Sequence, residues 1–538
     1  MHARTGYGVR RKTAAIALAW AMGMASAAQG GPIYWNHWQD LAGEWSNTNN
    51  WNLLRLPSIA AGDEAYITYK RTANVRTIGA EASTVYVGSY LGGGRLLVGS
   101  GADAYFPNLR IATPTDASSE LIMSGGTLTC NTLAMLEHGG PGLVLVTGGV
   151  FRVLAAGNAV QITHPTAYTY TGPQILALGG TGRMEMVNGT ASEIKVGSRP
   201  GAVARLHLSG DAVLTNLYRM TLGHSNNGGF GVVTISNNAV LQMNNNLYIG
   251  GDWDDDTDAE YGGTGIVTVA GGVLRAYDIH VGRYGTGELR MEGGNVLDVH
   301  DMVLAGSRGF GAVHQTGGTV DVERLYLSYV TTPSNCVYNL GGGTLRVRGA
   351  LQRLALQNYA FTITGGAFSF YRWMAAAANA AGMPTLTNAG GTMSPGLALA
   401  GITKIETDYV ETSSGSRISI DVGGTTQATA FTNAPGHYDH VNVSGSVALM
   451  GELQVNVIDG FAESARSTDK FYVLSSGGGI AGAFANVASG ERVTTPDGHT
   501  FLVYYGDNAA TTEAGVDPKK VTLTGFHHFP RGTVMLVR

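Results

Sequence analysis

Four short runs between Val269 and Leu345 share one pattern: a polar or small residue precedes a Gly-Gly pair, and branched apolar residues follow it. The runs are V-A-G-G-V-L (269–274), M-E-G-G-N-V (291–296), Q-T-G-G-T-V (315–320) and L-G-G-G-T-L (340–345). The second glycines, 272, 294, 318 and 343, are 22, 24 and 25 residues apart. Recurrence at this spacing is typical of a solenoid, in which each unit stacks on its neighbours.

The same spacing continues on both sides of this stretch. It is 23 residues from Gly126 to Gly149, 23 from Gly343 to Gly366 and 25 from Gly366 to Gly391. The repeats therefore extend over roughly residues 80 to 395, which is more than half of the chain.

Within each unit, apolar and polar residues alternate with a period of two, as in Gly265–Val269 and Gly287–Met291. Such alternation indicates short strands with one buried side. The sequence predicts an all-β protein, a right-handed parallel β-helix with one rung per 22–25 residues and glycines at its sharp corners. A β-propeller is the rival, but its blades need about 40–50 residues, which is two units each.

The repeat also resembles a known family. The pattern G-x-G-x-L/V-x-[MV]-x-G-G-x-[VL], followed by L-x-[IV]-G, is similar to the repeat of autotransporter passenger domains and PEP-CTERM-type surface proteins. Clear copies are Gly285–Leu289 with Gly293–Gly294, and Gly309–Val313 with Gly317–Gly318. The resemblance implies a bacterial extracellular β-helix. Neither the membrane barrel nor the PEP-CTERM anchor of those families is recognised near the end of the chain, so we expect both to be lacking.

Composition and charge exclude several classes of protein. Glycine supplies 79 of 538 residues, yet 44% of the residues are hydrophobic, so the chain is not a low-complexity disordered polymer. The 34 basic and 39 acidic residues give a formal charge of −5, without a basic stripe, and we expect no nucleic acid partner.

Residues 1–27 have the layout of a signal peptide. Arg10–Lys12 form a basic region, Ala14–Met24 a short apolar run and Ala25–Ala27 a small-residue cleavage site. No later apolar run approaches the ~20 residues that a spanning helix requires, so we expect no membrane span in the mature chain. The predicted location is extracellular or at the cell surface.

Cys130 and Cys336 are the only cysteines. They fall eight or nine predicted rungs apart, roughly 40 Å at ~4.8 Å per rung. A disulfide needs Cα atoms within about 7 Å. We therefore predict two free, buried thiols and no zinc site.

The remaining parts of the chain differ from the repeats at 79–394. Residues 28–78 are rich in tryptophan, and we interpret them as an N-terminal cap that covers the first rung; stacking of exposed indoles on sugars is the alternative. Residues 395–525, after Ser394-Pro395-Gly396, read as a C-terminal β-rich region, either final rungs or a small sandwich, and 526–538 as a tail. The four tryptophans of the cap are Trp35, Trp38, Trp45 and Trp51.

An acidic insertion lengthens one repeat to 34 residues, counted from Asn238 to Gly272. Carboxylate oxygens are the ligands that calcium prefers, although the EF-hand pattern is not met, because Ala259 and Gly265 stand where Gly and Glu are needed. Two interpretations stay open, a calcium-binding loop and a solvated insertion. The candidate ligands are Asp252, Asp254, Asp256, Asp258 and Glu260.

Polar residues that follow three successive Gly pairs are the best candidates for catalysis. Equivalent positions on neighbouring rungs lie ~5 Å apart, close enough for a pair of catalytic carboxylates. Every solenoid also stacks outward polar residues in this way, so a structural ladder is the alternative. The candidates are Asp278, Asp298, His300, Asp301, Glu323 and Arg324, with His280 and Asp321 beside them.

Taken together, these patterns predict an exported, non-enzymatic β-solenoid that acts as a surface or extracellular-matrix scaffold or adhesion protein. Its expected partners are glycans or other surface proteins. We expect no cofactor, and calcium at the acidic insertion is the alternative. The alternative is a β-helix carbohydrate-active enzyme, a polysaccharide lyase or glycoside hydrolase. The step from fold to function rests on resemblance.

Overall fold

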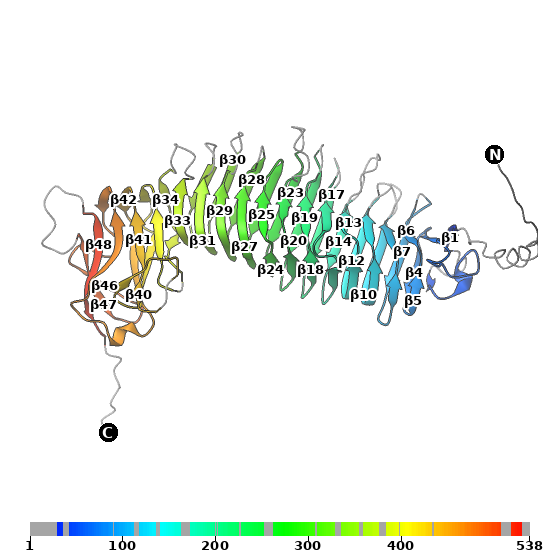
Figure 1. Cartoon of the computed structure of the whole chain (residues 1–538), viewed down its shortest axis with the longest axis horizontal. Coiled ribbons are helices and arrows are strands. Elements are labelled where there is room, and N and C mark those ends of the chain that lie inside the picture. Colours follow the sequence, from blue (N-terminus) through cyan, green and yellow to red (C-terminus); the bar gives the residue numbers. More distant parts are fainter. Residues whose placement is uncertain are drawn as a thin grey trace, which may run out of the picture.

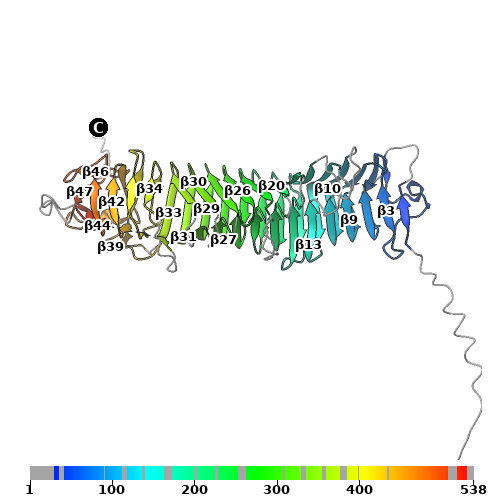
Figure 2. The same cartoon turned by 90° about the horizontal axis from the view of Figure 1, so that it is seen from above.

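The glycine-punctuated units form stacked rungs of parallel strands in a long rod (Figures 1 and 2). The computed structural model describes residues 30–529 except 36–41, 90, 112–117, 136–139, 163–172, 199–200, 202, 225–227, 252–261, 307–308, 329–334, 354–358, 376–383, 398, 433–434 and 507–517. Residues 1–27, predicted to be a signal peptide, lie outside this part. The predicted all-β parallel β-helix is confirmed.

Each rung contributes strands to three ladders, which we call faces 1, 2 and 3. Face 1 contains the strands that lead into the Gly pairs of the repeats, together with the strands of other rungs that stack on them. In chain order they are β2 (Ala42–Glu44), β4 (Arg71–Val75), β7 (Gly94–Val98), β10 (Ser119–Cys130), β12 (Gly142–Val153), β14 (Gln174–Leu178), β17 (Val203–Leu208), β20 (Phe230–Ile235), β23 (Thr264–Val269), β26 (Thr286–Met291), β28 (Phe310–Gln315), β30 (Asn335–Leu340), β32 (Tyr359–Ile363), β34 (Leu386–Asn388), β37 (Tyr409–Glu411), β42 (Ser446–Leu449) and β45 (Gly479–Gly482).

Face 2 contains the strands that follow the Gly pairs, including the second halves of β10 and β12, together with the strands of other rungs that stack on them. Its other strands are β5 (Ile78–Glu81), β8 (Asp103–Tyr105), β15 (Arg183–Met186), β18 (Val213–Leu217), β21 (Val240–Met243), β24 (Val273–Arg275), the first halves of β27 (Asn295–Leu304), β29 (Thr319–Leu327), β31 (Thr344–Arg353) and β33 (Ala367–Ala375), then β35 (Thr392–Met393), β38 (Arg417–Val422) and β43 (Glu452–Val457).

Face 3 contains the strands of the L-x-[IV]-G motif and the strands that stack on them, including the second halves of β27, β29, β31 and β33. Its other strands are β1 (Pro32–Tyr34), β3 (Glu64–Ile67), β6 (Thr84–Val87), β9 (Asn108–Ile111), β11 (Thr132–Met135), β13 (Gly157–Ile162), β16 (Ser192–Val196), β19 (Arg219–Leu222), β22 (Leu247–Ile249), β25 (Asp278–Val281), β36 (Ile402–Ile405), β41 (His440–Val443) and β44 (Phe471–Ser476).

The core runs along the axis of the rod, because alternate side chains of every face point inward. In β23, Gly265, Val267 and Val269 are buried while the residues between them are partly exposed. β26 and β28 pair with their neighbours in the same register, so equivalent side chains stack from rung to rung. A repeating unit that could not bury its apolar side alone does so by stacking.

The corner between faces 1 and 2 is made by the Gly pairs. The second glycine has a positive φ, which is +63° at Gly294 and +66° at Gly318. A Cβ at Gly318 would lie 2.3 Å from the carbonyl oxygen of Gly294 on the rung before. The repeat spacing read from the sequence is thus the spacing of these corners.

The N-terminal end of the core is closed by indoles. Trp35, Trp45 and Trp51 are buried, and the Trp51 ring packs edge-on against both others at 4.8 Å. No ring face of these three is open to a sugar, which fits the interpretation as a cap. Trp38 lies outside the described residues.

The ladders do not end at residue 394. β38 pairs with β43, β41 with β44 and β42 with β45, all parallel, so further rungs follow the repeat array. The last strands are antiparallel: β48 (Lys520–His527) pairs with β44 and β47 (Thr500–Tyr505), and β47 with β46 (Arg492–Thr494). Two short strands follow β38: β40 (His437–Tyr438) pairs with β38, and β39 (Thr426–Gln427) pairs with β40.

Helical structure is minimal. The described residues contain two three-residue 3₁₀ helices, η1 (Thr48–Asn50) and η2 (Phe461–Glu463). Within the same residues, no helix has the length and apolar character that crossing a membrane would require.

Candidate functional site

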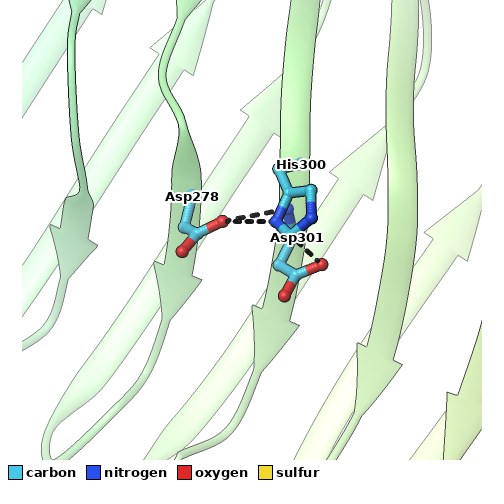
Figure 3. A group of neighbouring side chains, drawn as sticks. All are labelled: Asp278, His300 and Asp301. Carbon is cyan, nitrogen blue, oxygen red and sulfur yellow. Dashed lines mark hydrogen bonds and ion pairs between the residues drawn. The ribbon is translucent and has the colours of Figure 1, made fainter.

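Three of the candidate residues, Asp278, His300 and Asp301, lie together on the outside of face 3 (Figure 3). Strand pairing brings them together: Asp278 of β25 is the register partner of Asp301 in β27, and Asp301 is the partner of Arg324 in β29. The expected stacking of equivalent polar positions on successive rungs therefore holds for these residues.

Arg324 holds Asp301 by two parallel hydrogen bonds. Arg324 Nε donates to Asp301 Oδ1 at 2.6 Å, and Arg324 Nη2 donates to Asp301 Oδ2 at 2.9 Å. This two-point arrangement is the strong form of a carboxylate–guanidinium pair. The Asp301 carboxylate is thus already neutralised by the protein.

His300 lies between the two carboxylates. Its Nδ1 is 3.5 Å from Asp278 Oδ1 and 3.5 Å from Asp301 Oδ1, and its ring stacks on Tyr277 at 5.0 Å. Arg324 Nη2 is 3.0 Å from His300 Nε2. Because a guanidinium can only donate, Nε2 accepts and the ring proton is assigned to Nδ1, facing the carboxylates.

Asp278 is the one carboxylate of the group that has no arginine beside it in these contacts. One of its oxygens accepts a hydrogen bond from the backbone N–H of Asp301 at 3.0 Å. Burial, and after it the negative charge of Asp301, raise the pKa of the Asp278 carboxyl above its usual value. Catalytic groups often have a shifted pKa, and in this cluster Asp278 is the group that has one.

The set Asp278, His300 and Asp301 has the composition of a metal site, with ligand atoms within 4.8 Å of one another. Arg324 argues against a metal ion there. An ion on Nδ1 would require the proton on Nε2, which would then face the N–H of Arg324. The guanidinium already supplies the positive charge that an ion would bring.

The other candidates are separate from this group. Asp298 lies in a β-bulge with a φ of +61°, its side chain is 63% exposed, and it pairs with Arg275 of the rung before. Arg348, from the next rung, has its Nε 3.2 Å from Asp321 and 3.6 Å from Glu323. Asp298, and the pair Asp321 and Glu323, thus lie apart from the group of Asp278, His300 and Asp301.

His280 lies under an aromatic ring. It stacks on Tyr248 at 4.9 Å, and burial, followed by the charge of Arg283, lowers the pKa of His280 to about 3. This imidazole is neutral at physiological pH and packs as an aromatic ring.

Ion pairs between neighbouring rungs recur along the rod. Their partners lie one rung apart on the outside of the faces, as in the candidate groups. Such pairs include Arg95–Glu120, Arg152–Glu185, Arg219–Glu193 and Arg417–Glu452. Asp298, Asp301 and Glu323 share this pattern, in which exposed pairs contribute little stability individually, about 0–1 kcal/mol.

The candidate calcium ligands lie outside the described residues. The segment that holds Asp252, Asp254, Asp256, Asp258 and Glu260 connects β22 of face 3 to β23 of face 1. The calcium interpretation therefore stays a prediction.

A serine–histidine contact in the C-terminal rungs was not foreseen from the sequence. His440 Nε2 is 2.9 Å from Ser475 Oγ, and His440 Nδ1 contacts the Gln427 amide. Burial, followed by the charge of Lys404, lowers the pKa of His440 to about 4. An amide takes the place where a hydrolase triad has a carboxylate, so no such triad is formed.

Asp439, which was not among the candidates from the sequence, has a structural role. It is fully buried, and its two carboxylate oxygens accept backbone N–H bonds from Gly401 at 2.6 Å and Asp421 at 2.7 Å. The short D-x-V-x-V-x-G run was the only signal that could have revealed it.

Comparison with known proteins adds no family. No protein-family model matches the chain, and no curated protein matches it.

Proposed function

We propose that the chain is an exported, non-enzymatic β-solenoid that serves as a rigid surface or extracellular-matrix scaffold with an adhesive role. The observation that carries this proposal is the pairing of the outward candidates. Asp301, Asp298 and Glu323 each lie against an arginine, from the next rung for Asp301 and Glu323 and from the one before for Asp298. Carboxylates held in this way stabilise a ladder and are poor proton donors or nucleophiles.

The shape of the rod supports the same proposal. Within the described residues, sixteen parallel pairings join the seventeen strands of face 1 from β2 to β45. At ~4.8 Å per rung, this ladder is roughly 75 Å long. A continuous hydrogen-bonded rod with a filled core holds its two ends at a fixed distance and presents long flat faces to glycans or other surface proteins. Export rests on the layout of residues 1–27 alone.

A carbohydrate-active enzyme is the second candidate function, and one observation favours it. Asp278 has a raised pKa and lies within reach of His300 and Asp301, so it could act as a general acid. The scaffold proposal is favoured because Asp301, the second carboxylate of such a pair, is bound by Arg324.

Activity assays on polysaccharides separate the two functions. The wild type and the double variant Asp278→Asn/His300→Gln, which keeps the Asp301–Arg324 pair, are incubated with acidic and neutral polysaccharides. We expect neither protein to release sugar fragments. Reproducible release by the wild type that is lost in a variant of unchanged melting temperature would establish the enzyme.

The location of the protein is tested in cells that make it. Protease added to intact cells, followed by fractionation and immunodetection, should find the chain outside the cell and without residues 1–27. Retention of the full chain inside the cell would overturn the export part of the proposal.

A further inference from the structure

The face 1 ladder opens between two neighbouring rungs. β32 pairs with β30 over five residues, from Tyr359 to Ile363, but it pairs with β34 at a single position, Ile363 with Asn388. Continuing that register would place Phe361 opposite Leu386, and no pairing is formed there. The strands thus separate over the length of β32 that precedes Ile363.

Along the edge of β32 that borders this opening, main-chain groups have no strand partner among the residues that the structure describes. In a parallel ladder, the N–H and C=O of one residue face the same neighbouring strand, and those of the next residue face the strand on the other side. The Ala389 N–H donates to the Ile363 C=O at 2.8 Å, so Ile363 faces β34. The peptide groups of Phe361 and Tyr359 therefore also point into the opening.

The opposite edge is arranged in the same way. The Leu386 N–H donates to Asp408 on the far side at 2.9 Å. By alternation, the peptide groups of Thr385 and Thr387 face β32 across the opening. Two strand edges with matching alternation thus border one gap.

Side chains of the core are accessible through this gap. Phe361 is the register partner of the fully buried Tyr338, yet Phe361 and Tyr359 are only half-buried. The opening is a groove of about 450 Å³, within the size range of ligand sites. Its lining comprises Arg353, Tyr359, Ala360, Phe361, Thr362, Trp373, Pro384, Thr385, Leu386 and Thr387.

The groove carries a positive charge. Arg353 is the single charged residue of the lining, and its guanidinium carbon lies 5.0 Å from the centre of the Tyr359 ring. The lining contains no acidic residue. A carboxylate on a bound molecule would complement the positive charge of Arg353.

We propose that this groove binds an extended polypeptide segment of a partner protein that carries an acidic side chain. The segment adds to β32 as an extra strand, exchanges main-chain hydrogen bonds with Phe361 and Thr387, and directs an apolar side chain toward Trp373. Its carboxylate pairs with Arg353. An opening of four residues, from Tyr359 to Thr362, matches roughly 13 Å of extended chain.

A peptide fits this gap better than a sugar, because both borders offer alternating N–H and C=O groups at the spacing of a strand. The inference is independent of the proposed scaffold role, since strand addition needs only the open ladder. It would hold for an enzyme of the same fold.

The test uses the full chain and a fluorescent seven-residue peptide, T-V-T-F-T-V-D, with binding followed by fluorescence anisotropy. We expect saturable binding that is abolished when alternate amides of the peptide are N-methylated, because methylation keeps the side chains and removes the donors. Replacing the peptide's aspartate by asparagine should weaken binding on the order of tenfold, the loss of one charge-assisted contact. Equal binding of the methylated peptide would overturn strand addition.

Two protein variants locate the site. Arg353→Gln should weaken binding on the order of tenfold. Arg372→Gln is the matched control, because this half-exposed arginine of β33 does not line the groove, and it should bind as the wild type does. Both variants are checked for an unchanged melting temperature. Equal effects of the two substitutions would overturn the assignment to the groove.

Hydrogen exchange gives a readout that does not depend on either variant. Addition of the peptide should slow exchange at the amides of Phe361 and Thr387 and leave the paired strands β20 and β23 unchanged. Protection of these amides by an oligosaccharide panel but not by the peptide would overturn the proposal in favour of a sugar site.

Discussion

An added methyl group should have very different effects at two glycines of the run Leu340–Gly343. Gly343 has a φ of +72°, and a Cβ there would lie 2.3 Å from the Gly318 carbonyl oxygen, whereas the nearest atoms to a Cβ at Gly341 lie 3.7 Å away. Gly343→Ala should therefore cost roughly 2–4 kcal/mol, from the left-handed backbone and the clash together. Gly341→Ala should stay within about 0.5 kcal/mol. Denaturant unfolding of both variants measures this, and equal costs would contradict the corner assignment.

Glu411 should make stability depend on pH. It is buried, its Oε2 accepts from the N–H groups of Met450 and Gly451, and burial raises the pKa of its carboxyl. A raised folded-state pKa means that the stabilising contribution is present below the unfolded value of 4.5 and is lost as pH rises through the folded value. Relative to wild type, Glu411→Gln should thus gain stability as the pH is raised from about 5 to 8.

Gln is a suitable replacement because it mimics the protonated acid, offering one oxygen to the two backbone donors and an N–H toward the Tyr409 hydroxyl, which the Glu411 carboxylate contacts at 3.1 Å. Melting curves of both proteins at several pH values give the difference. If the difference in melting temperature between the two proteins does not change with pH across this range, Glu411 is ionised in the folded state without a cost in stability.

Residue-level prediction from sequence succeeded where a position is set by backbone geometry. The second glycines of the Gly pairs, whose spacing defined the repeat, have a positive φ from Gly126 to Gly366. At the last unit the positive φ belongs to Gly390 and not to Gly391. Asp298 could not be placed, because the bulge that turns it toward Arg275 inserts one residue that no periodicity reveals. Its neighbour Asp301, beyond the bulge, keeps the rung register.

At the scale of elements, the corner between faces 3 and 1 is where repeat length varies. β22 ends at Ile249 and β23 begins at Thr264, whereas β25 ends at Val281 and β26 begins at Thr286. Long connections here leave the three ladders intact, which explains why the 34-residue unit does not interrupt the rod. The opening between β32 and β34 was not predictable, because both strands carry ordinary alternation and only their spacing in three dimensions reveals it.

The acidic connection between β22 and β23 can be tested as a calcium site. If residues 252–260 bind the ion, added calcium should raise the melting temperature by mass action, and Asp254→Asn with Asp256→Asn should remove that gain. Magnesium at the same concentration is the control for ionic strength. An unchanged wild-type melting temperature would leave a solvated insertion as the interpretation.

At the scale of the whole molecule, the sequence predicted the stacking direction and the period, which suffice to place distant residues relative to one another. It placed the end of the Gly-pair repeats at Ser394–Gly396 and left open whether final rungs or a small sandwich follow; the parallel ladders run on to β45. Later rungs lack the regular Gly-pair spacing, so the repeat period did not reveal them. Buried polar anchors such as Asp439 hold these rungs instead.

The separation of the two cysteines follows from the stack as a whole. Eight pairings lead from β10, which contains Cys130, to β30, which contains Cys336, so the thiols are roughly 38 Å apart along the axis. Both are free and buried, as predicted from the sequence. Burial raises the pKa of both thiols, that of Cys336 to about 12, so neither forms a reactive thiolate near neutral pH.

We therefore expect a thiol reagent to modify neither cysteine in the native protein and both after unfolding in denaturant. Mass spectrometry without reductant should show two added groups per chain only in the unfolded sample. An intramolecular Cys130–Cys336 disulfide would require these rungs to be adjacent, and its detection would contradict the order of the ladder. Rapid modification in the native state would instead mean that the core opens near the reacting rung, because a buried thiol cannot react before the strands around it separate.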